Sequence, residues 1–104
     1  MGYSATANAI DRLNMIMREN DNASSNTWDN GDTTYFYEIG RENSDGSVTG
    51  SVYEIRGKYA RKKGGFKIDS YGKVLRFPGL TKKMREAGNR PLPVLLDPIT
   101  LSML

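Results

Sequence analysis

Two turn signals in the middle of the chain limit the folds that it can adopt. Asp45-Gly46 and Tyr71-Gly72 each place a glycine where the chain is expected to reverse. Asp-Gly is typical of two-residue hairpin loops, because glycine accepts the positive φ that such loops require. Aromatic and β-branched residues flank both signals and favour strands. The pattern predicts two antiparallel hairpins between residues 33 and 79.

The first predicted hairpin pairs residues 34–39 with Val48–Arg56. A two-residue loop at Asp45-Gly46 places Ile39 opposite Val52 on one face and Phe36 opposite Ile55 on the other. Both faces are therefore partly apolar. Either both are covered, one by an N-terminal helix and the other by the C-terminal tail or a partner, or some aromatic side chains stay exposed.

The second predicted hairpin pairs residues 66–70 with residues 73–77 around Tyr71-Gly72. The predicted register pairs Phe66 with Phe77 and Ile68 with Leu75 on one face, and Lys67 with Arg76 on the other. Like charges in direct cross-strand opposition destabilise a sheet, so an anion bound between Lys67 and Arg76 would relieve a real repulsion.

Helical periodicity appears on both sides of the hairpins. Residues 4–19 carry an apolar stripe at spacings of three and four, with Ser4 as the expected N-cap, and residues 81–87 form a shorter candidate with Gly88 as the expected C-cap. Residues 20–32 are polar, and Trp28 is expected to anchor this connection to the core. The sequence predicts an α+β fold: an N-terminal helix packed on a four-stranded antiparallel β-meander, a short second helix and an extended hydrophobic C-terminal tail.

Residues 1–90 are expected to form a single small domain, and residues 91–104 differ from it in composition. Three prolines argue against a long helix, and the density of large aliphatic side chains argues against a free tail in water. The tail either folds back over the first hairpin or docks extended on another chain, and we favour the second. The expected docking residues are Val94, Leu95, Leu96, Ile99, Leu101 and Leu104.

Charge is divided into two blocks along the chain. Residues 1–55 carry three basic and nine acidic side chains, a net charge of −6, whereas residues 56–90 carry twelve basic and two acidic ones, a net charge of +10. A field of this kind attracts anionic partners. The candidate contacts are Arg56, Lys58, Tyr59, Arg61, Lys62, Lys63, Lys67, Arg76, Lys82, Lys83 and Arg85.

The absence of histidine and cysteine excludes several classes of function. Ser-His-Asp and Cys-His catalysis, disulfides and zinc sites with the usual ligands all require one of these residues. We therefore expect a non-enzymatic protein without a metal or cofactor. No apolar run reaches the ~18–20 residues of a membrane span, and no secretory signal is recognisable, so we expect no membrane contact and a cytoplasmic or otherwise intracellular location.

Together these features predict a small accessory protein that binds nucleic acid through its basic surface, within a larger assembly. Binding would be directed by charge and shape, since no base-reading motif is present. The alternative is a protein-interaction module, an inhibitor or a structural subunit. Such a module would engage an acidic partner with the basic face and a groove with the tail.

Overall fold

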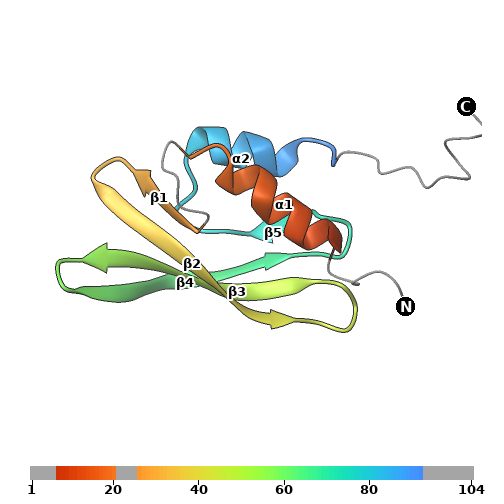
Figure 1. Cartoon of the computed structure of the whole chain (residues 1–104), viewed down its shortest axis with the longest axis horizontal. Helices are drawn as coiled ribbons and strands as arrows, with labels where there is room; N and C mark the ends of the chain where they lie inside the picture. Colours follow the sequence, from red (N-terminus) through yellow and green to blue (C-terminus); the bar gives the residue numbers. More distant parts are fainter. Residues whose placement is uncertain (1–6, 21–25, 93–104) are drawn as a thin grey trace, which may run out of the picture.

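The computed structural model describes residues 7–20 and 26–92 of the chain. Within them two helices pack on one side of a five-stranded antiparallel sheet, whose strands follow one another in chain order (Figure 1). The elements are α1 (Ala7–Met17), β1 (Thr27–Asn30), β2 (Thr33–Glu42), β3 (Val48–Arg56), β4 (Tyr59–Ile68), β5 (Val74–Arg76) and α2 (Lys82–Asn89). The predicted α+β class is confirmed, but the sheet has five strands where four were predicted.

The additional strand is β1, which lies in the segment that the sequence predicted to be a polar connection. A two-residue loop, Gly31-Asp32, joins it to β2, with Asn30 opposite Thr33. Trp28 is fully buried, and its indole N–H donates to the carbonyl oxygen of Gly79 at 2.9 Å. The anchoring role of Trp28 is confirmed, and a strand rather than a loop provides it.

The register predicted for β2 and β3 is wrong by two residues. Val52 faces Tyr37 instead of Ile39, and Phe36 faces Tyr53 instead of Ile55. One residue of the difference arises in the loop, which has three residues because Asn43 N–H bonds the carbonyl oxygen of Ser47 at 2.8 Å. The other arises at a β-bulge between Ile39 and Arg41, which adds one residue to β2.

The pairing of β4 with β5 is partly as predicted. Lys67 lies opposite Arg76, as expected, but Ile68 faces Val74 and not Leu75. The turn again holds three residues, since Asp69 N–H bonds the carbonyl oxygen of Lys73 at 2.9 Å. Leu75 is consequently 49 % exposed and does not join the core.

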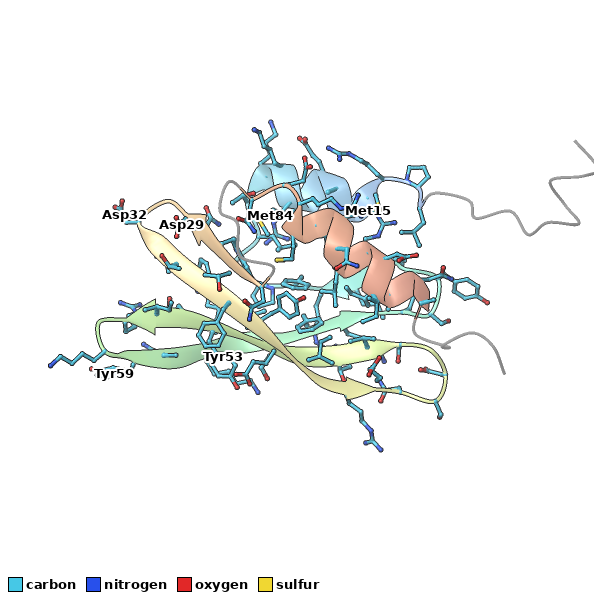
Figure 2. The ribbon with its side chains drawn as sticks, viewed as in Figure 1. Met15, Asp29, Asp32, Tyr53, Tyr59 and Met84 are labelled. Atoms are coloured by element: carbon cyan, nitrogen blue, oxygen red, sulfur yellow. The ribbon has the colours of Figure 1, made fainter. Side chains whose placement is uncertain are left out.

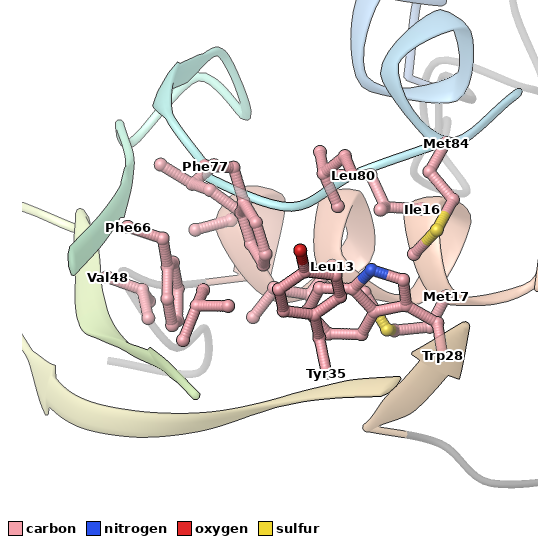
Figure 3. Packing of buried hydrophobic residues seen from close by; sticks show 13 residues of the cluster. Leu13, Ile16, Met17, Trp28, Tyr35, Val48, Phe66, Phe77, Leu80 and Met84 are labelled. Carbon is pink, nitrogen blue, oxygen red and sulfur yellow. The ribbon is translucent and has the colours of Figure 1, made fainter. Parts of the chain in front are cut away.

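The core lies between the helices and one face of the sheet (Figure 3). The rings of Phe66 and Phe77 stack with their centroids 4.6 Å apart, which confirms that these side chains are neighbours on the buried face. Trp28 stacks on Tyr35 at 5.8 Å and extends the aromatic cluster toward α1. The remaining large core side chains are Leu13, Ile16, Met17, Val48, Val52, Ile68, Leu80 and Met84.

Helix α1 ends within two residues of its predicted limit, and both ends of α2 lie within two residues of theirs. The stripe of Ala9, Leu13, Ile16 and Met17 is buried, as predicted, whereas Ser4 lies outside the described residues. In α2 the hydroxyl of Thr81 caps the helix by accepting from Met84 N–H at 3.2 Å. Gly88 is not the C-cap but a buried residue inside α2, close to the side chains of Val74 and Ile16, so a small residue suits this crossing.

Arg12 is a buried cation that joins three elements. Only 5 % of the residue is exposed, and its guanidinium donates from Nε to the carbonyl oxygen of Gly72 and from Nη1 to that of Ala87, both at 2.6 Å. Burial lowers the pKa of Arg12. The α2 carbonyl lies near the negative end of the helix dipole and favours a cation there. Arg12 thus ties α1 to α2 and to the loop between β4 and β5.

Phe66→Ala should lower the free energy of unfolding by about 3–5 kcal/mol, because it leaves a cavity beside Phe77 in a packed core. Leu75→Ala is the matched control on the neighbouring strand and should cost less than about 1 kcal/mol, since half of that side chain is exposed. Urea denaturation measures both. Equal losses would show that the aromatic cluster is not the centre of the core.

Arg12→Met should cost about 2–4 kcal/mol, because two buried carbonyl oxygens lose a charged donor while the aliphatic volume is retained. Arg18→Met serves as the control, since Arg18 is exposed at the end of the same helix. The comparison uses thermal and urea denaturation of both variants. If the two arginines proved equally dispensable, the bridging role of Arg12 would be refuted.

Candidate nucleic-acid interface

The basic segment that follows Arg56 is part of a β-hairpin. The two predicted hairpins left residues 57–65 outside any strand, but most of them begin strand β4. Strands β3 and β4 pair continuously and reverse at Gly57-Lys58, where Gly57 has a φ of +59°. Glycine at the first position of a two-residue loop is the usual requirement of a type II′ turn. Residues 55–63 are all exposed. Figure 1 shows this end of the hairpin extending away from both helices.

The two faces of the sheet can be assigned from register and burial. The core face carries Tyr35, Val52 and Phe66, all of which are buried. Side chains alternate along a strand, so Phe36 and Tyr53 lie on the opposite face, which we call the open face. Within the described residues both helices lie on the core side. The helix therefore covers one apolar face of the first predicted hairpin, and none of the described elements covers the other.

Two β-bulges direct basic side chains to the open face. Without the bulge in β2, Arg41 would continue the core-facing series of Tyr35, Tyr37 and Ile39. The extra residue instead places Arg41 opposite Thr49, which lies on the open face. A second shift, at Lys63 in β4, places Lys62 opposite Tyr53, where Lys63 would otherwise lie. Each bulge thus reverses the facing of the strand beyond it.

A row of three cations crosses the open face of the sheet. Thr49 on β3 has Arg41 on one side and Lys67 on the other, and Lys67 is followed by Arg76 on β5. Neighbouring strands lie about 4.8 Å apart, so the row spans roughly 14 Å. Arg41 was not predicted as a member of this row, because the bulge that positions it has no signal in the sequence beyond Gly40.

An acidic side chain partly compensates this row. The pKa of the Asp45 carboxyl is lowered by hydrogen bonds from the side-chain hydroxyl and the backbone N–H of Ser47, and further by the positive charge of Lys67. The two bonds measure 2.6 and 2.8 Å. Asp45 thus contributes a negative charge on the Lys67 side of this row.

An aromatic pair lies beside the cations on the open face. Phe36 and Tyr53 stack with their ring centroids 5.0 Å apart and their planes inclined by 19°. Lys62 is directly opposite Tyr53, and Ile55, two residues further along β3, is 43 % exposed. Figure 2 shows Tyr53 between the strand crossing and the hairpin end, where Tyr59 lies. This pair was not predicted, since the wrong register separated the two rings.

The cations of the hairpin differ in how far they are neutralised. Arg56 donates to the carboxylate of Glu54 at 3.1 Å, and Arg61 lies opposite the same residue. Glu54 is 93 % buried on the core side, so this half of the hairpin is partly compensated. Within the described residues, no ion pair or side-chain hydrogen bond involves Lys58, Lys62 or Lys63.

The basic residues of α2 lie in the helix layer, so they do not continue the open face directly. Lys82, Lys83 and Arg85 are exposed on α2. Arg85 and Arg76 line a common pocket of about 200 Å³ between β5 and α2, over Phe77. Arg76 therefore lies at the edge where the two basic regions meet, and the single continuous surface predicted from sequence is divided by the edge of the sheet.

The predicted docking residues of the tail, Val94, Leu95, Leu96, Ile99, Leu101 and Leu104, lie outside the described residues. Leu92 is the last described residue, and its side chain lies close to Gly72 in the loop between β4 and β5. The described start of the tail thus returns toward the domain.

Comparisons with protein-family models, with curated proteins and with solved structures give no match to this chain. Residues 7–20 and 26–92 contain no cluster of acidic side chains suited to a metal ion. The described helices are too short and too polar to cross a membrane.

Asp45→Asn should lower the melting temperature at neutral pH. Folding lowers the pKa of Asp45, so its carboxylate stabilises the fold above its ordinary pKa of 3.8, and this contribution is lost as pH falls through the lowered value. The difference between wild type and variant should therefore shrink in acid, as followed by circular dichroism melts. Lys67→Ser should weaken the same acid-sensitive contribution. A difference in melting temperature that is independent of pH would contradict this account.

Proposed function

We propose that this chain is a small non-enzymatic accessory protein that binds nucleic acid through its basic surface, within a larger assembly. The observation that carries the proposal is the placement of cations on the open face. Two independent bulges bring Arg41 and Lys62 to the side of the sheet that already holds Lys67 and Arg76. Four cations from β2, β4 and β5 therefore lie on one face of the sheet, and this concentration of positive charge favours an anionic partner.

The spacing of these cations suits a polyanion. Lys62 and Lys67 are five residues apart on one strand, about 16 Å, which is roughly the axial length of five nucleotides of a B-form strand. Lys58 and Lys63 add charge toward the hairpin end. Arg56, Arg61, Lys82, Lys83 and Arg85 are proposed as peripheral contacts. Such contacts position the nucleic acid without reading its sequence.

An acidic protein surface is the second candidate partner. The exposed Ile55 beside the cations favours it, since a mixed apolar and basic surface also suits a protein interface. In that case the hydrophobic tail would dock on the same partner or on a neighbouring subunit of the assembly.

The proposal predicts a specific change in salt dependence. Lys62→Ala combined with Lys63→Ala should weaken binding to any sequence, measured by fluorescence anisotropy with labelled oligonucleotides at several salt concentrations. If each lysine contacts one phosphate, the slope of log K against log salt should fall by about 1.8 for duplex DNA and about 1.4 for a single strand. Arg18→Ala combined with Lys73→Ala removes the same charge elsewhere and should change the slope much less.

A pull-down with and without nuclease separates the two candidates. Loss of co-purifying material after nuclease treatment supports nucleic acid, and retention of a protein partner supports the alternative.

Lys62 and Lys63 also flank a strand edge, because β5 pairs only with residues 67–68 of β4. If they served only to protect that edge, the double variant would self-associate in sedimentation experiments while its salt slope stayed unchanged.

A further inference from the structure

We infer that the stacked Phe36–Tyr53 pair is a base-stacking platform, and that the chain prefers single-stranded over duplex nucleic acid. This inference rests on the proposed function and names the class of nucleic acid. It follows from the two rings, which lie on adjacent strands, 5.0 Å apart, on the face that neither described helix covers.

The sheet has no internal need for these rings on the open face. The folding core already contains Trp28, Tyr35 and Phe77 on the other side. Two large aromatic side chains and the half-exposed Ile55 form an apolar patch where solvent-facing residues of an antiparallel sheet are usually polar. Patches of this kind on small proteins usually mark interaction sites.

The charges around the pair select a nucleic acid as the occupant. Lys62 lies directly across from Tyr53, and the row of Arg41, Lys67 and Arg76 crosses the same face about four residues away, roughly 13 Å along the strands. Aromatic rings bordered by cations are the usual arrangement for binding single strands, in which bases stack on the rings while the backbone follows the positive charge.

A duplex cannot use the rings in this way. Its bases are stacked on one another and paired, so a flat sheet face contacts only phosphates and groove edges, whereas an unpaired base can extend the Phe36–Tyr53 stack. The cations contribute to both complexes through counterion release. The aromatic pair contributes to the single-stranded complex alone, and this difference is the basis of the expected preference.

The position of Glu38 indicates the path of the strand. Glu38 lies two residues from Phe36 on β2 and faces Ser51, so a carboxylate adjoins the platform on that side. Lys62 adjoins it on the β4 side. Phosphates should therefore follow β3 and β4, with bases directed toward Tyr53 first and Phe36 second.

The test compares Tyr53→Leu with Tyr71→Leu. Both remove a tyrosine ring and keep an apolar side chain, but Tyr71 is 83 % exposed in the loop between β4 and β5, away from the platform. The probes are a labelled single strand of about twelve thymidines, within the usual site size, and a labelled duplex of the same length. Tyr53→Leu should weaken single-strand binding about 5- to 150-fold, the equivalent of 1–3 kcal/mol for one stacked base, and change duplex binding less than about twofold.

The outcomes separate this inference from the proposed function. If Tyr53→Leu binds both probes as the wild type does while the Lys62/Lys63 variant loses both, the platform is refuted and the basic surface stands. If the wild-type chain binds neither probe at low salt, both proposals fail.

Ultraviolet cross-linking of the wild-type chain to the single strand provides a measurement independent of folding defects. Cross-links at Tyr53 or Phe36 support the platform, and cross-links confined to other residues overturn it.

Discussion

The contact of the Phe66 ring with the backbone of β3 at Gly50 is the constraint on which the packing of this sheet depends. Any side chain at Gly50 would occupy the space that the ring fills. Because Gly50 leaves room for the ring there, Phe77 can stack on it at 4.6 Å and Tyr37 can meet it edge-on at 5.7 Å. The core is thereby assembled where β3, β4 and β5 meet, and both helices pack over that region.

The lengths of the elements determine what this core leaves exposed. The 11 residues of α1 span about 16 Å and the 8 residues of α2 about 12 Å, whereas the 10 residues of β4 extend for about 33 Å. Helices gathered around Phe66 cannot reach the outer half of the β3–β4 hairpin. Residues 55–63 at its end are all exposed, and the bulge at Lys63 lies among them. Tyr53, which stacks on Phe36 of β2, lies close by on β3.

The sequence predicted the parts of the fold that depend on local pattern and missed those that depend on single inserted residues. Helical stripes, the two hairpins, the buried Phe66 and the Lys67–Arg76 opposition follow from periodicity and turn chemistry. Loop length and bulges do not follow from these patterns, because two- and three-residue loops contain the same kinds of residue. Each added residue turns every later side chain of that strand to the opposite face of the sheet. The Phe36–Tyr53 pair and the facing of Arg41 were lost for this reason. The bridge made by Arg12 joins elements 60 and 75 residues away, which no local pattern encodes.

The antiparallel topology changes the meaning of the charge division seen in the sequence. Strand β3 belongs mostly to the acidic block and β4 to the basic block, and their pairing brings Glu54 opposite Arg61, while Glu54 also pairs with Arg56 on its own strand. Asp45 acts on Lys67. Glu19 likewise meets Arg90 at 3.3 Å. Arg56 and Arg90 are thus paired with carboxylates from the acidic block. Within the described residues, no ion pair involves Lys58, Lys62 or Lys63 on the outer hairpin, so these lysines should contribute strongly to the field that a partner meets and to the salt dependence of binding.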